Sequence, residues 1–136
     1  ASESDATRLR EIAKALLDST APALWVDGSH LDSKKGDLVF VADRSAVGKL
    51  ADLSKATKGT IPDVLIDEWI QELVFDDAAL ADIAIRDAVA AGGDVKKIAH
   101  ATNEQAKAAA AAASGKAAEA IGSYKNAWKK AQDAVK

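Results

Sequence analysis

The chain has 136 residues and a formal net charge of −3, and 49% of its residues are hydrophobic although only 4% are aromatic. A chain of this length can form one hydrophobic core, so we expect a single helical domain over residues 1–136. With no cysteine in the sequence, disulfides and thiolate chemistry are excluded. No apolar run approaches the ~20 residues of a membrane-spanning helix.

Charge is distributed unevenly along the chain. Residues 61–93 carry eight acidic side chains and one basic one, whereas residues 94–136 carry eight lysines and four acidic side chains. This pattern argues against one uniform basic face for nucleic acid. It predicts instead that the two segments attract each other, within one chain or between chains.

The sequence begins with the small, polar stretch ASESDA and contains no methionine. Such a start is typical of a chain from which a signal peptide has been cleaved, so we expect an exported protein, periplasmic or extracellular. Removal of an initiator methionine from a cytoplasmic protein would leave a similar start.

The first predicted elements are a helix and a small β-hairpin. Ser2 or Ser4 can cap the helix, Pro22 follows it, and one apolar face is formed at helical spacing by Leu9, Ile12, Ala13, Leu16 and Leu17. Two short apolar runs, ALWV and DLVFVA, then predict a two-stranded hairpin within residues 23–42. A pair of strands is marginal alone, so helices would have to pack on it.

Three further helices are predicted from their N-terminal signals. Asp43 can cap the first, which Gly59 would end. Thr60 and Pro62 suit the start of the second, whose broad apolar face around Trp69 predicts a central position with neighbours on two sides. Asp76 or Asp77 would cap the third, which ends at the paired glycines 92–93.

The last segment, residues 94–136, can form one helix of about 65 Å. Gly115 and Gly122 are the positions at which it could bend or break. The predicted fold class is therefore mainly α: a bundle of about five helices with a small two-stranded β-hairpin near residues 23–42 and a long, alanine-rich C-terminal helix that could project.

A strip of small side chains along this helix predicts a docking surface. The strip consists of Ala106, Ala110, Ala113, Ala117, Ile121, Tyr124 and Trp128. Because alanine has no side chain beyond Cβ, a second helix can approach closely. The first functional hypothesis is thus a non-catalytic, exported interaction or structural subunit that binds a protein partner or a second copy of itself. The alternatives are a helix that completes its own bundle, and weak association of its lysines with a charged surface.

The second hypothesis is a carrier that binds an apolar ligand between helices, with Trp69 and its neighbours lining the cavity. Trp25, Trp69 and Trp128 are all expected to anchor the core, and Trp128 is the one most prone to exposure because it lies near the terminus.

The third hypothesis is a metal-dependent hydrolase that uses Asp27 and Asp43, each of which follows an apolar run. Both are already explained as turn or cap residues, and phosphate-loop and nucleophile motifs are absent. His100 and Glu104 are one helical turn apart, and His30 could join them only if the fold brought them together. These residues are too few to predict a metal site, so we expect no enzyme, no cofactor and no metal.

Overall fold

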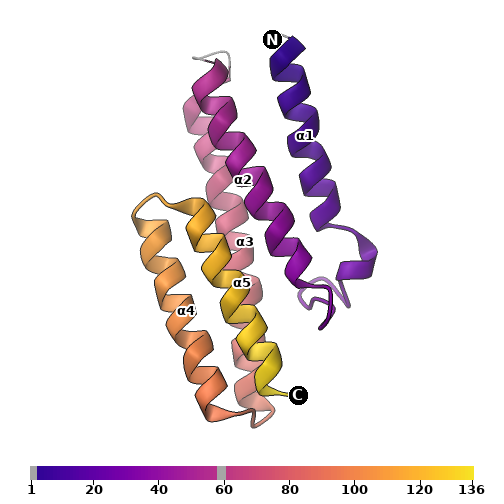
Figure 1. The fold of residues 1–136 in the computed structure, drawn as a ribbon, viewed down its shortest axis with the longest axis vertical. Helices are drawn as coiled ribbons and strands as arrows, with labels where there is room; N and C mark the ends of the chain where they lie inside the picture. Colours follow the sequence, from indigo (N-terminus) through magenta and orange to yellow (C-terminus); the bar gives the residue numbers. More distant parts are fainter. Residues whose placement is uncertain (1–2, 58–60) are drawn as a thin grey trace.

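The structure is a computed structural model that describes residues 3–57 and 61–136, and it confirms a mainly α fold of five helices (Figure 1). The elements in chain order are α1 (Glu3–Ser19), the short 3-10 helix η1 (Pro22–Leu24), α2 (Asp37–Thr57), α3 (Asp63–Ala90), α4 (Val95–Ala113) and α5 (Ala117–Ala134).

Helix α3 is the longest element and runs the length of the molecule (Figure 1). Its 28 residues span roughly 42 Å at 1.5 Å per residue. In the view of Figure 1, α1 and α2 lie with its upper part, and α4 and α5 lie with its lower part. The molecule is thus two three-helix groups that share α3, and contacts between α2 and α5 join them.

The hydrophobic core has two parts that follow this division. The larger cluster joins α2, α3, α4 and α5, and in it the rings of Phe40 and Trp128 lie 6.0 Å apart. The smaller cluster holds Ile12, Leu50 and Ile66 together. Helix α1 packs chiefly on α2 and makes few contacts with α3. This uneven packing of α1 is what positions the candidate site described below.

The predicted β-hairpin near residues 23–42 is wrong. In the described part of the chain the structure has no strand, only one isolated bridge between Trp25 and Leu31. The second predicted strand is the first turns of α2. Its buried Val39 and Phe40 continue at helical spacing into Val47 and Leu50, so an extended apolar face, rather than two marginal strands, uses these residues.

Two predicted helix boundaries are also wrong. Asp43 lies inside α2, and Asp76 and Asp77 lie inside α3, so none of them caps a helix. No glycine or proline separates residues 63–75 from residues 76–90, and nothing in the backbone therefore ends the helix at that point.

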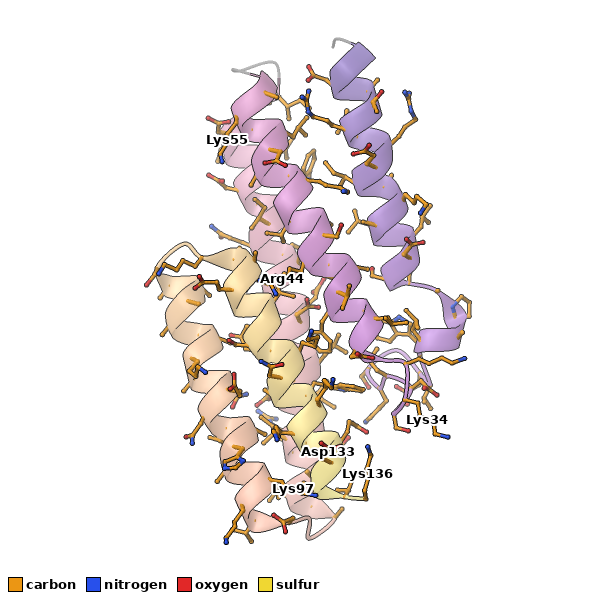
Figure 2. The ribbon with its side chains drawn as sticks, in the orientation of Figure 1. Lys34, Arg44, Lys55, Lys97, Asp133 and Lys136 are labelled. Atoms are coloured by element: carbon orange, nitrogen blue, oxygen red, sulfur yellow. The ribbon has the colours of Figure 1, made fainter. Side chains whose placement is uncertain are left out.

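The predicted long C-terminal helix is two helices. The chain turns at Ser114–Lys116, where Gly115 has a φ of +77° and the Lys116 amide donates to the Ala111 carbonyl oxygen at 2.8 Å. Helix α5 then packs back along α4, so this segment does not form a single projecting rod (Figure 1). Gly122 stays within α5, where a Cβ atom would lie 3.1 Å from Nη1 of Arg44, the α2 residue labelled in Figure 2.

The alanines do allow close helix packing, but mainly between α4 and α5. Ala101 and Ala108 of α4 and Ala120 and Ala127 of α5 are buried. Among the described residues, no ion pair joins a lysine of residues 94–136 to an acidic residue of 61–93. Lys107 pairs with Glu104 instead, and Lys136 pairs with Asp133 close to Lys97 at the lower end of the molecule (Figure 2). The predicted attraction between the two segments therefore has no direct ion pair.

None of the helices, over the residues that the structure describes, combines the length and apolarity needed to cross a membrane.

Candidate functional site

Two adjoining pockets lie between α1 and α3, where the packing of α1 leaves room. They have volumes of about 320 Å³ and about 420 Å³, and both are lined by Leu16 of α1 and Leu73 of α3. We call the smaller one the apolar pocket, the larger one the acidic pocket, and the two together the α1–α3 cleft. These volumes, at the lower end of the usual range for ligand pockets, suit a small molecule.

The apolar pocket is built from the inward face of α1 and the facing side of α3. Its lining consists of Leu9, Ile12, Ala13, Leu16, Leu50, Trp69, Glu72 and Leu73. Glu72 is the one ionisable residue in this lining. Trp128 is 3% exposed and lies in the core as expected, whereas Trp69 is 40% exposed. The expectation that Trp69 anchors the core, and that Trp128 is the tryptophan most prone to exposure, is therefore wrong. A large aromatic side chain beside an apolar pocket favours contact with an apolar ligand.

The acidic pocket brings three carboxyl groups from two helices together. Asp43 comes from α2, and Asp76 and Asp77 come from α3. Most of the remaining lining is apolar or aromatic and includes Trp25 and Leu80. The buried carboxyl groups of Asp43 and Asp77 can interact strongly with a ligand charge, because little water screens them, whereas Asp76 is exposed at the edge of the pocket.

The two inner carboxyl groups are buried, and three of their oxygens receive no hydrogen bond from a donor of the described residues. Asp77 is 0% exposed and Asp43 is 4% exposed. Within the described residues, neither carboxylate oxygen of Asp77 has a hydrogen-bond partner, and Oδ1 of Asp43 has none. A buried polar group without a partner costs free energy of about 1–3 kcal/mol. A proton shared between Asp77 and Asp43 satisfies part of this need, and a bound donor would satisfy the rest.

The protonation of these groups follows from their surroundings. Burial raises the pKa of Asp77 strongly, and the adjacent carboxyl of Asp43 and the charge of Asp76 raise it further. Burial also raises the pKa of Asp76, together with the charges of Glu72 and Asp43. Asp76 and Asp77 therefore both resist ionisation, and a positive charge placed beside them would favour their ionised forms.

The connection between α1 and α2 covers one side of the acidic pocket. Nε1 of Trp25 donates to the Ser19 carbonyl oxygen at 2.8 Å, which ties this connection to the end of α1. Leu24 and Leu31, on either side of the turn, are buried in the core. These contacts fix Trp25, Gly28 and Ser29 in the pocket wall.

His30 clamps the same connection onto α3. Its Nδ1 lies 2.9 Å from Asp27 Oδ1, and its Nε2 lies 2.8 Å from Asp87 Oδ2. Hydrogen bonds to these two carboxylates raise the pKa of His30, and the bond to Asp27 has the larger effect. Hydrogen bonds from the Ser29 backbone and from His30 lower the pKa of Asp27 to about 2.

This cluster resembles a Ser-His-Asp arrangement only in composition. Ser29 Oγ is 3.1 Å from His30 Nδ1, but Asp27 Oδ1 lies 3.2 Å from the same hydroxyl and 2.9 Å from the same ring nitrogen. An imidazole held between two carboxylates is stabilised as the cation, in which both nitrogens donate. It is then unable to accept the serine proton, so the cluster serves as a clamp on the loop.

The predicted docking strip divides between surface and core. Ala106, Ala110 and Ala113 of α4 are exposed, and Ala117 is half-buried at the start of α5. Ile121, Tyr124 and Trp128 of α5 are buried in the larger hydrophobic cluster. Docking through this strip stays a prediction, and three of its seven side chains are not accessible at the surface.

The residues of the predicted hydrolase and metal sites lie in different surroundings. Asp27 is engaged by His30 on the loop, whereas Asp43 lies in the α1–α3 cleft. His30 pairs with Asp27 and Asp87, and His100 is exposed on α4. Across residues 3–57 and 61–136, no group of three or more His, Cys, Asp or Glu side chains is arranged to hold a metal ion.

Sequence reasoning missed the acidic pocket because it assigned Asp43 and Asp77 to helix caps. The available signal was the unbroken helical spacing of the apolar residues before and after each aspartate, which places both residues within helices.

In comparisons with known proteins, no protein-family model, no curated protein and no solved structure matches the chain.

Proposed function

We propose that the protein is a non-catalytic carrier that binds a small, mainly apolar molecule in the α1–α3 cleft. The observation that supports this proposal most directly is the apolar pocket, with its nearly continuous lining of aliphatic side chains and partly exposed Trp69. Burial of a ligand's hydrocarbon surface there would contribute about 25 cal/mol per Å².

The geometry favours a carrier over docking through the C-terminal helix. Helix α5 packs against α2, α3 and α4, so its large side chains already stabilise the fold. Helix α1, in contrast, packs mainly on α2, and its side facing α3 borders the cleft. A wall with few contacts on one side can adjust to an entering molecule at low cost.

Titration with an uncharged amphiphile tests this proposal. Decanol, kept below the concentration at which it aggregates, is expected to bind saturably with one molecule per chain, and to change the fluorescence of Trp69. Ala13→Phe would fill the apolar pocket from α1 and is expected to weaken binding at least about tenfold.

Ala99→Phe is the matched control, because Ala99 is exposed on α4 and belongs to neither pocket of the cleft. It should bind decanol as the unchanged chain does. Absence of saturable binding to the unchanged chain, or equal binding by both variants, would show that this cleft is not a carrier site.

A further inference from the structure

The acidic pocket holds three carboxyl groups from two helices. The side chain of Asp77 is fully buried and lines the pocket, and among the described residues its oxygens accept no hydrogen bond from an N–H or hydroxyl donor; the group beside it is the carboxyl of Asp43. Asp43 approaches it from α2, and Asp76 lies next to it on α3. A proton on Asp77 can bridge it to Asp43, but it leaves further carboxyl oxygens of this buried pair without a donor, and a positively charged donor from outside would interact with them most favourably.

The charged groups around this point all have one sign. The pocket residues from α1 and from the connection between α1 and α2 carry no charge. They are Leu16 and Ser19 of α1, and Thr20, Trp25, Gly28 and Ser29 of the connection. Helices α2 and α3 contribute three aspartates, and no lysine, arginine or histidine of residues 3–57 and 61–136 lines the pocket. This part of the chain therefore supplies no counter-ion in the lining.

We propose that the ligand is an amphiphilic primary amine, an inference that rests on the proposed function. Asp43, Asp76 and Asp77 bind its ammonium group, and its hydrocarbon chain extends into the apolar pocket. Leu16 and Leu73 line both pockets, so the two pockets adjoin, and a ligand that occupies both would pass between these leucines. An ammonium group carries three donors, which matches three carboxyl groups.

The lining favours an organic cation over a metal ion. Calcium takes six to eight oxygen ligands, and magnesium requires a nearly octahedral set. The aspartates of the acidic pocket do not form a metal-binding arrangement, since none is present in the described parts of the chain. The aliphatic walls and Trp25 would instead contact the methylene groups next to the ammonium, and an indole face can attract a cation directly.

Three probes with one tail and different head groups test the inference by isothermal titration calorimetry. Decylamine is expected to bind at least about tenfold more tightly than decanol, and decanoate more weakly than decanol. Decanol reports on the proposed function alone, and the ratio of amine to alcohol affinity reports on the charged head group.

Asp77→Asn is the decisive variant, because it removes the group that would ionise beside the ammonium and nearly preserves the shape. It should lower decylamine affinity about tenfold and leave decanol affinity within about twofold. Asp76→Asn, at the more exposed edge of the pocket, provides a second variant should Asp77→Asn fold poorly. Glu68→Gln is the matched control: it makes the same replacement of a carboxyl by an amide on an exposed residue of α3 outside the cleft.

The outcomes separate the two proposals. Binding of decanol with no preference for decylamine would overturn the amine assignment and leave the carrier function standing. Absence of binding by all three probes would overturn both. An effect of Glu68→Gln as large as that of Asp77→Asn, or displacement of decylamine by equimolar Mg²⁺, Ca²⁺ or Zn²⁺, would also overturn the amine assignment.

Proton release gives an independent readout. Because the pKa of Asp77 is raised by burial and by Asp43 and Asp76, this carboxyl keeps its proton in the unliganded cleft at neutral pH. An ammonium group favours the ionised form, so decylamine should displace a proton that decanol does not. The apparent heat of decylamine binding should then differ between Tris and phosphate buffers, and equal heats would place the head group away from Asp77.

Discussion

At the scale of single residues, the aspartates show where local patterns mislead. Asp43 and Asp77 each precede a stretch that resembles a helix start, and a cap is the commonest use of aspartate at such a place. In the structure both lie inside helices and face each other across the interface of α2 and α3. The residues were visible in the sequence, but their meeting depends on helix packing that no local pattern contains.

Asp77 should make stability fall as pH rises. Its pKa is raised in the folded chain, so above its unfolded value of 3.8 the folded state binds a proton that the unfolded state has lost. The free energy of unfolding should therefore decline from about pH 5 upward, by as much as ~1.4 kcal/mol per pH unit. Urea unfolding at pH 5, 6, 7 and 8 should show a shallower decline for Asp77→Asn. Parallel curves for the two chains would contradict this prediction.

His30 should titrate above its ordinary pKa of 6.5, because Asp27 and Asp87 stabilise the imidazolium. The clamp therefore stabilises the folded chain fully below about pH 6.5 and loses this effect as pH rises through the raised pKa. An NMR titration of the imidazole C–H signals should show this shift, and Asp87→Asn should reduce it. His100→Gln removes the only other histidine signal and so assigns the resonances. An unchanged His30 titration in Asp87→Asn would exclude the clamp.

At the scale of elements, the fold class was predictable, and several element boundaries were not. The apolar spacing around Leu9 and Trp69 predicts helices that the structure contains. The hairpin failed because the short run that contains Phe40 suits both a strand and a buried helix turn. The C-terminal break at Gly115 was among the two positions that the sequence offered, and only the close packing of α4 on α5 selects it.

The two glycines at positions 115 and 48 should respond oppositely to alanine. Gly115 has a positive φ, so Gly115→Ala should lower the free energy of unfolding by about 1–2 kcal/mol. Gly48 lies inside α2, with open space where the Cβ atom of an alanine would lie, so Gly48→Ala should raise it by about 0.5–1 kcal/mol. Urea unfolding of both variants measures the difference, and a neutral Gly115→Ala would argue against the turn.

Replacement of an α4 alanine by a larger residue should destabilise the fold only where that alanine faces the core. Ala108 is fully buried between helices, so Ala108→Leu should lower the free energy of unfolding by about 1–3 kcal/mol through overpacking. Ala110 is exposed, and Ala110→Leu is its matched control with an expected change within about 0.5 kcal/mol. Thermal unfolding followed by circular dichroism distinguishes the two, and similar values would contradict the packing of α4 on α5.

At the scale of the whole molecule, the α1–α3 cleft is a property of assembly. Trp69 was predicted to line a ligand cavity, and it does line the apolar pocket. The acidic pocket could not be predicted, because it needs α2, α3 and the connection before α2 to be placed together. Leu16 and Leu73 line the same cleft but lie far apart in the sequence. Local periodicity predicts the apolar face of each helix, but it does not predict which helix faces leave a cleft between them.

The hairpin of α4 and α5 has a consequence for how the chain folds. A three-residue turn joins α4 to α5, so little conformational entropy is lost in closing the loop when the two helices pack together. We expect this hairpin to be ordered early, and α1, held mainly by α2, to dock late. Substitutions in α1 should then accelerate unfolding more than they slow refolding. The last helix to dock would be the one that borders the cleft, so ligand entry and the first step of unfolding would share one motion.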